Sequence, residues 1–305
     1  MPALTKSIYL AFKKPKLEQE VSFINGIDKA RNILLRLAEK SPHTLFSIYT
    51  AAALKADKKR RKITAIAPPH GQMLITPFGK LFDDVTEVVE TPSYGSKAFK
   101  TLKEKLETRE FDAYLDLDSN PLSELAVASN ANLRIAYYKD NLFPFFNILF
   151  RSSGQENLLE RSKLITRMLS EETRLEQSMP KPRIESSKAS DWLKKHGIFK
   201  NKSFVITSIP LEKESLKGMK VVPQQKWEGE SDDVKAALFT SAAFYVGGLD
   251  RGFEMSYLMG TPSVLVIAEK EADPGLPPSP FVKSVIRSSH PSPDVIEGAL
   301  SGNSN

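Results

Sequence analysis

The feature that most constrains the fold of this chain is the alternation of short apolar runs with longer segments of helical periodicity. A short run rich in β-branched residues predicts a buried strand, and apolar residues that recur with a helical period predict an amphipathic helix. Strands that alternate with helices in this way form βαβ units and a parallel sheet. The sequence therefore predicts an α/β protein.

The expected elements run through the whole chain. In the first half, strands are expected at residues 32–37, 63–67, 85–89, 113–117 and 133–137, and helices at 45–54, 97–108, 122–128 and 156–168. In the second half, strands are expected at residues 203–209, 220–223, 243–247 and 263–267, and helices at 189–196, 232–241, 252–259 and 293–300. Gly197 is suited to end its helix in a left-handed conformation, and Ser231 is suited to cap the next helix.

Two domains are expected because the 305 residues exceed the size at which one core usually stops growing. The pattern lapses around Pro180 and Pro182, where two nearby prolines favour an extended connection. We therefore expect a first Rossmann-like domain over residues 1–175, a linker over 176–188 and a second, shorter Rossmann-like domain over 189–305.

Composition excludes several classes of site. The chain has no cysteine, which rules out disulfides and thiolate chemistry, and its four histidines lack the spacing of metal ligands. No G-x-G-x-x-G follows the first strand and no G-x-S-x-G is present, which speaks against a dinucleotide-dependent enzyme and against a serine hydrolase. No apolar stretch has the length of a signal-peptide core or a membrane span, so a cytoplasmic protein is expected. With no metal-ligand pattern and no dinucleotide motif, no metal or cofactor is expected.

Two local segments leave alternatives open. The basic run at residues 58–62 is either a solvated loop or a contact for an anionic membrane or glycolipid surface, and no nucleic-acid motif accompanies it. The phenylalanine-dense residues 142–150 either pack in the core or face a membrane as a peripheral contact.

Four segments in the same order resemble the ADP-heptose:lipopolysaccharide heptosyltransferases, which have the GT-B fold. They are ARNILLRLAEKSPHTLFSIYTAAAL, RKITAIAPP, FDAYLDLDSNPLSELAVASNANLRIAYY and FYVGGLDRGFEMSYLMGTPSVLVI. The last is similar to the donor-site signature of that family and keeps its Val246, Gly247, Gly260 and Pro262. The resemblance implies two Rossmann-like domains facing across a cleft, with the acceptor on the first domain and a nucleotide-sugar on the second.

The predicted donor site lies after the strand at residues 243–247. Gly247 and Gly248 let the backbone approach a ligand, and the helix that follows offers N–H groups to a diphosphate. By the resemblance, Asp250 and Glu254 belong to the same site, where Glu254 accepts hydrogen bonds from ribose hydroxyls or is simply a glutamate favoured by the helix dipole. Lys213, Lys217 and Lys226 are the candidates for contact with phosphate.

The sequence departs from the family at its catalytic positions. The Gly-Asp loop that would hold the general base reads Ser41-Pro42, and His43 is the neighbouring candidate for that role. In the donor signature, Leu249, Asp250 and Glu254 replace the aspartate, the serine and the histidine. Asp116 and Asp118 have the form of a D-x-D metal motif but are expected at the end of a strand.

Two functions remain open from the sequence. One is a transferase that moves a sugar from a nucleotide-sugar to a cell-envelope glycan or glycolipid such as the lipopolysaccharide core. The other is a catalytically inactive relative that acts as a binding or scaffold protein.

Overall fold

The computed structural model describes residues 29–56, 60–68, 71–87, 92–151, 158–169, 181–198, 203–211, 213–270, 276 and 280–301. The chain divides into two compact units. The first consists of Met1–His70 and Lys80–Pro180, and the second of Gly71–Gly79 and Lys181–Asn305. The short segment Gly71–Gly79 therefore belongs to the unit formed by the second half of the chain. The sequence did not predict that a segment of the first half would pack in the second unit.

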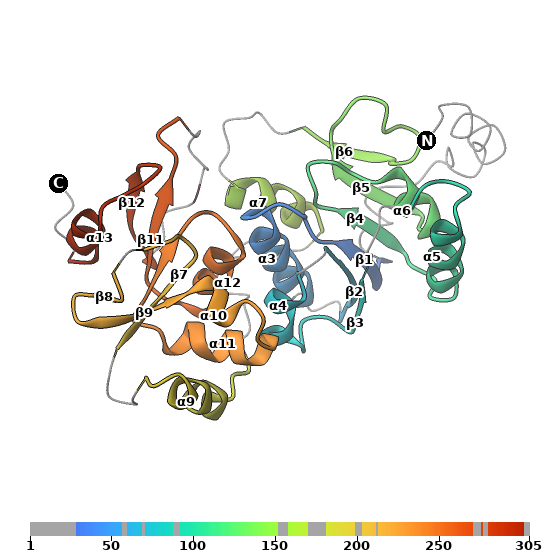
Figure 1. Cartoon of the computed structure of the whole chain (residues 1–305). Helices are drawn as coiled ribbons and strands as arrows, with labels where there is room; N and C mark the ends of the chain where they lie inside the picture. Colours follow the sequence, from blue (N-terminus) through green and yellow to red (C-terminus); the bar gives the residue numbers. More distant parts are fainter. Residues whose placement is uncertain are drawn as a thin grey trace. The chain divides into compact units, whose positions relative to one another are not determined.

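The first unit is a parallel six-stranded sheet in the order β3-β2-β1-β4-β5-β6 (Figure 1). Its strands are β1 (Asn32–Arg36), β2 (Lys62–Ala67), β3 (Asp84–Glu87), β4 (Ala113–Asp116), β5 (Leu133–Tyr137) and β6 (Ile148–Phe150). Its helices are α3 (His43–Ala56), α5 (Lys97–Glu107), α6 (Ser123–Ala128) and α7 (Leu158–Leu169). Ile33, Leu34 and Leu35 of the central β1 are all buried, as expected when helices cover both faces of a parallel sheet.

The second unit is a six-stranded sheet in the order β12-β11-β10-β7-β9-β8, in which only the pairing of β8 with β9 is antiparallel. Its strands are β7 (Phe204–Thr207), β8 (Ser215–Leu216), β9 (Met219–Pro223), β10 (Phe244–Gly247), β11 (Ser263–Ile267) and β12 (Val282–Arg287). Its helices are α9 (Ser186–Lys195), α10 (Gln224–Trp227), α11 (Asp232–Ser241), α12 (Arg251–Met259) and α13 (Pro293–Leu300), with α4 (Gln72–Ile75) and the 3-10 helix η1 (Thr76–Phe78).

The expected α/β fold class with two Rossmann-like sheets is confirmed. Strands β5 and β11 and helices α11 and α13 have the predicted bounds. Gly197 has φ +68°, the left-handed conformation expected after α9. Ser231 stands at the N-cap position of α11, but its side chain makes no capping hydrogen bond, so that expectation was wrong.

The two segments with open alternatives each contain both buried and exposed side chains. In the phenylalanine-dense segment Phe145 and Phe146 are buried, whereas Phe143 is 65% exposed. In the basic run Arg60 and Lys62 are exposed, whereas Arg61 is buried and its Nε donates to the Ala30 carbonyl. Lys58 and Lys59 lie outside the described residues, so both interpretations of the run stay open. Within the described ranges, no helix combines the length and the apolar character needed to span a bilayer.

Candidate functional site

The strand order of the second sheet creates a topological switch point, the place at which open α/β sheets commonly bind ligands. From β7 the chain continues to β9 on one side of β7 and later returns to β10 on the other side. The connections that leave β7 and β10 therefore run in opposite directions, and such a switch point opens a crevice at the carboxyl ends of the strands. At these ends, Thr207 is the last residue of β7 and is followed by Ser208, and Gly247 is the last residue of β10 and is followed by Gly248. The predicted donor residues lie at this edge.

A chain of hydroxyl groups occupies the edge. The buried Tyr245 hydroxyl donates to Asp250 Oδ1 at 2.6 Å and lies 2.8 Å from Ser208 Oγ. Burial, followed by the nearby Asp250 charge, raises the pKa of Tyr245 well above its ordinary value. The phenol therefore stays protonated at neutral pH and connects the ends of β7 and β10 with the start of α12.

Gly247 is required by this internal packing. A Cβ atom at Gly247 would lie 2.1 Å from Ser208 Oγ and 2.3 Å from the Tyr245 hydroxyl. At Gly248 the same addition would meet only the Val266 carbonyl at 3.7 Å, which is ordinary contact. The close approach that the sequence assigned to a ligand at Gly247 is made by Tyr245 and Ser208 themselves, and Gly248 is the glycine at which a Cβ atom would fit without a clash.

Asp250 caps α12 with its side chain. Its Oδ1 accepts from the Phe253 N–H at 3.0 Å, and its carbonyl accepts from the Glu254 N–H at 3.1 Å. A carboxylate at an N-cap satisfies helix N–H groups that would otherwise face an anion. One of the donors expected to bind a diphosphate is thus already bonded within the protein.

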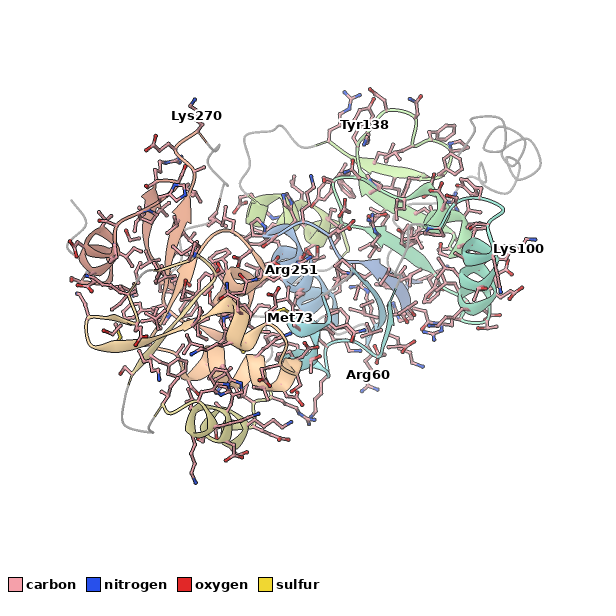
Figure 2. All side chains as sticks on the ribbon, in the orientation of Figure 1. Arg60, Met73, Lys100, Tyr138, Arg251 and Lys270 are labelled. Atoms are coloured by element: carbon pink, nitrogen blue, oxygen red, sulfur yellow. The ribbon has the colours of Figure 1, made fainter. Side chains whose placement is uncertain are left out.

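Glu254 is fully buried and bonded to Arg251. Its Oε2 accepts from Arg251 Nη1 at 2.6 Å, and the side chain has no exposed surface. Arg251 is half-buried on the first turn of α12, where Figure 2 labels it. The ribose contact proposed for Glu254 stays a prediction, and in this structure its carboxylate neutralises a neighbouring guanidinium.

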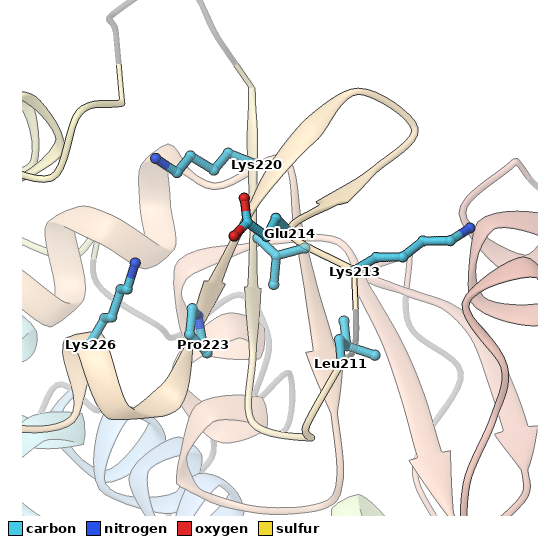
Figure 3. Close-up of a pocket in the computed structure, with 7 residues that line it drawn as sticks. Leu211, Lys213, Glu214, Lys220, Pro223 and Lys226 are labelled. Carbon is cyan, nitrogen blue, oxygen red and sulfur yellow. The ribbon is translucent and has the colours of Figure 1, made fainter.

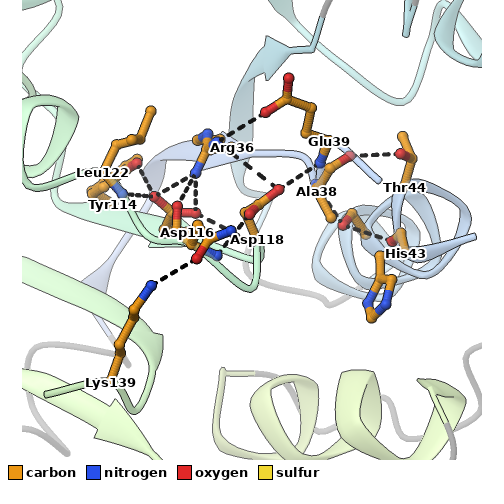
Figure 4. A network of polar contacts seen from close by, with 12 residues as sticks. Arg36, Ala38, Glu39, His43, Thr44, Tyr114, Asp116, Asp118, Leu122 and Lys139 are labelled. Atoms are coloured by element: carbon orange, nitrogen blue, oxygen red, sulfur yellow. Dashed lines mark hydrogen bonds and ion pairs between the residues drawn. The ribbon is translucent and has the colours of Figure 1, made fainter. Parts of the chain in front are cut away.

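The first sheet has a second switch point, between β1 and β4. There Arg36 Nη1 donates to Asp116 Oδ1 at 3.0 Å, and the Tyr114 hydroxyl donates to Asp116 Oδ2 at 2.7 Å (Figure 4). Burial raises the pKa of Asp116, an effect that Arg36 and the Leu122 N–H oppose. Asp116 ends β4 as expected and lies within a fully bonded cluster.

Asp118 fixes the loop after β1. Its Oδ2 accepts from the Glu39 N–H at 2.6 Å, and its Oδ1 accepts from the Asn120 N–H at 2.7 Å. In the part of the chain that the structure describes, no group of three or more acidic or histidine side chains is placed to hold a metal ion. The D-x-D arrangement therefore positions backbone loops.

His43, the candidate base, begins α3 and is half-buried. Its backbone N–H donates to the Lys40 carbonyl at 2.8 Å. Figure 4 shows its ring pointing away from the carboxylates of Asp116 and Asp118. These side chains do not orient the imidazole as a carboxylate would in a catalytic pair, and the catalytic role of His43 stays a prediction.

A cavity of about 320 Å³ lies beside β9 and α10 (Figure 3). Its lining residues are Leu211, Lys213, Glu214, Lys220, Val221, Pro223 and Lys226. Lys213 points toward α13, where it pairs with Asp294 at 3.1 Å, whereas Lys226 and Lys220 extend on the opposite side of the cavity. Lys217 instead bonds to Ser301, so the structure brings together two of the three predicted phosphate contacts.

Known proteins resemble this chain in fold, whereas the sequence comparisons find no match. No protein-family profile and no curated protein matches the sequence. Among solved structures, a glycosyl transferase family 9 protein from Veillonella parvula is similar over 88% of each chain, with a TM-score of 0.65 and 14% identity. This chain has the GT-B fold of the heptosyltransferase-like glycosyltransferases.

Two further structures from E. coli have the same fold. The ADP-heptose lipopolysaccharide heptosyltransferase II aligns over 89% of this chain and 98% of its own, with a TM-score of 0.62 and 12% identity. Heptosyltransferase WaaC with ADP aligns over 89% and 97%, with a TM-score of 0.55 and 13% identity. The GT-B architecture is therefore common to these chains although few residues are shared.

Proposed function

We propose that this chain is a heptosyltransferase-like glycosyltransferase that moves a sugar from a nucleotide-sugar to a cell-envelope glycan such as the lipopolysaccharide core. The observation that carries the proposal is the switch-point edge of the second sheet, where β10 ends at Gly247 and Gly248 follows it before α12. In support, structures of similar fold are named heptosyltransferases, and one of them was solved with ADP.

The chemistry needs a base and a means to stabilise the departing diphosphate. In this proposal His43 accepts the acceptor proton, because Pro42 stands where the resemblance puts the aspartate. Basic side chains such as Lys226 stabilise the diphosphate without a metal or other cofactor. His43→Ala is then expected to lower kcat by roughly 100-fold or more, with little change in nucleotide affinity.

Peripheral contact with the inner face of the membrane belongs to the same proposal. Phe143 is 65% exposed and Tyr138 is 44% exposed, and the Arg151 guanidinium lies 4.2 Å from the Tyr138 ring. Aromatic and basic side chains together favour an anionic bilayer surface. Sedimentation with anionic liposomes at low salt should carry the protein into the pellet, and Phe143→Ser should leave it in the supernatant.

The second candidate function is a catalytically inactive relative that acts as a binding or scaffold protein in the cytoplasm. Three observations favour it: Asp250 caps α12 itself, Glu254 is buried on Arg251, and Pro42 replaces the base. Recovery of a defined protein partner, with no nucleotide binding, would support this function.

A thermal-shift screen against ADP, UDP, GDP, CDP and TDP separates the two candidates. A ligand at 100 times its Kd stabilises the folded state by about 2.7 kcal/mol, which raises Tm by several degrees. The transferase proposal predicts such a shift with one nucleotide, with ADP as the first choice. The absence of any shift at millimolar concentrations would contradict it and favour the scaffold.

A further inference from the structure

The arrangement of protons at the switch point of the second sheet decides whether Ser208 donates or accepts its hydrogen bond with Tyr245. Tyr245 has one hydroxyl proton, and it goes to Asp250 Oδ1 because a short bond to a carboxylate is the strongest one available. The Gly248 carbonyl, at 3.4 Å, is the weaker alternative for the same proton. In the 2.8 Å contact with Ser208, Tyr245 must therefore accept, and Ser208 donates its own proton inward.

Two hydrogen-bond acceptors are left at the edge. Ser208 Oγ is half-buried and keeps its lone pairs, since its proton is committed to Tyr245. Asp250 is half-buried as well, and within the described part of the chain its side-chain bonds are all made by Oδ1, which leaves Oδ2 to accept. Both side chains are bonded to the same buried phenol.

The charge of this edge disfavours a diphosphate. Asp250 places a negative charge at the start of α12, and its Oδ1 already bonds the Phe253 N–H that would face an anion. The neighbouring cation Arg251 is bonded to the buried Glu254 carboxylate. A ligand at this position must therefore donate hydrogen bonds and carry no negative charge there.

We propose that Asp250 and Ser208 form an acceptor pair that binds adjacent hydroxyl groups of a sugar ring. The inference rests on the proposed function, because a nucleotide-sugar supplies the ring. The ring is either the ribose of the nucleotide or the transferred sugar. The diphosphate then binds away from the start of α12.

The test measures binding of ADP, 2′-deoxy-ADP, ADP-heptose and a panel of methyl glycosides by titration calorimetry and saturation-transfer NMR. The variants are Asp250→Asn, which keeps a capping side chain and turns one oxygen into a donor, and Ser208→Ala. Asp191→Asn, an exposed position on α9, is the matched control for charge. Near-ultraviolet circular dichroism checks that each variant is folded.

For a ribose source, ADP should bind the wild type roughly 10-fold more tightly than 2′-deoxy-ADP does, the effect of one hydrogen bond to a charged group. If the ring is the transferred sugar, ADP-heptose should bind the wild type roughly 10-fold more tightly than ADP does. Asp250→Asn and Ser208→Ala should remove the gain in either case, and Asp191→Asn should change nothing.

The inference and the proposed function fail in different ways. Glycoside binding that Asp250→Asn abolishes, without binding of any nucleotide, would retain the acceptor pair and remove the transferase. Nucleotide binding without either hydroxyl-dependent gain, or with a gain that persists in both folded variants, would overturn the acceptor pair alone. Failure of every ligand to bind the wild type would overturn both.

Discussion

At the scale of single residues, alanine substitutions at Gly247 and Gly248 form a matched pair, because only Gly247 is packed against Tyr245 and Ser208. Gly247→Ala would force a Cβ to within 2.1 Å of Ser208 Oγ, and overpacking of this kind costs about 1–3 kcal/mol. Gly248→Ala meets nothing closer than 3.7 Å and should cost less than about 1 kcal/mol. Urea unfolding of both variants measures the difference, and equal stabilities would contradict the packing role of Tyr245.

Arg36 and Asp116 form a buried pair whose partners cannot be removed singly. Asp116 has no exposed surface, so Arg36→Met would leave a buried carboxylate without its cation, at a cost of about 3–5 kcal/mol. The double variant Arg36→Met/Asp116→Asn should be more stable than Arg36→Met alone, because the uncompensated charge is gone. Chemical denaturation checks the order, and a single variant within about 1 kcal/mol of wild type would show that the pair contributes little.

At the scale of elements, Asp83 connects the starts of β2 and β3 and makes stability depend on pH. Its Oδ2 accepts from the Ile63 N–H at 2.7 Å and from Lys55 Nζ. Partial burial would raise the pKa of Asp83, but the bonds to Lys55 and Ile63 outweigh it and the pKa lies below its usual value. The ionised form therefore stabilises the fold above the unfolded-state pKa of about 3.9, and that contribution is lost as the pH falls through the lower folded-state pKa.

The corresponding variant is Asp83→Asn. It should lower stability at neutral pH and flatten the fall in stability below about pH 5, because no proton is then taken up at this position on unfolding. Guanidinium denaturation at a series of pH values measures the slope, with the exposed Asp191→Asn as control. An unchanged slope in Asp83→Asn would show that the carboxylate is not linked to folding.

Sequence patterns predicted the central strands, which are buried on both faces, and missed the edge strand β12 and the short helix α4. β1 and β11 are nearly continuous apolar runs, because helices cover both faces of a parallel sheet. β12 alternates between half-buried and exposed residues at the edge of its sheet, and its sequence VKSVIR has no continuous apolar run. α4 has only four residues, too few to show a helical period.

The sequence could predict only those parts of the candidate site whose residues are close together in the chain. The glycines at the end of β10 and the start of α12 were recognised because they are close together in the sequence. Tyr245 and Ser208 were missed because their contact depends on the pairing of β10 with β7, and strand order is a tertiary property. The buried state of Glu254 was missed for a similar reason, since a first-turn glutamate is usually exposed.

At the scale of the whole molecule, the second unit depends on a segment from the first half of the sequence. Leu74, Ile75 and Phe78 are buried, α4 packs on α11, and Thr76 Oγ1 bonds to Asp232 at 3.3 Å. A fragment of residues 181–305 should therefore expose apolar surface and be less stable than the same unit in the full chain. Urea unfolding followed by circular dichroism tests this, and an unchanged midpoint for the fragment would contradict the role of residues 71–79.

The transferase proposal also belongs to the whole molecule, because the GT-B likeness covers 88% of the chain rather than one motif. Fold alone does not establish activity, and the altered positions at Pro42, Asp250 and Glu254 make a direct assay necessary. Release of nucleotide that requires both a nucleotide-sugar and a glycan acceptor reports transfer itself.

The decisive measurement is therefore acceptor-dependent release of ADP from ADP-heptose in the presence of heptose-free lipopolysaccharide core, with the mass of the acceptor followed in parallel. The account predicts nucleotide release together with an acceptor heavier by one sugar, both lost in His43→Ala. If the folded wild-type protein leaves the acceptor mass unchanged with sugars of ADP, UDP, GDP, CDP and TDP, the transferase proposal is contradicted.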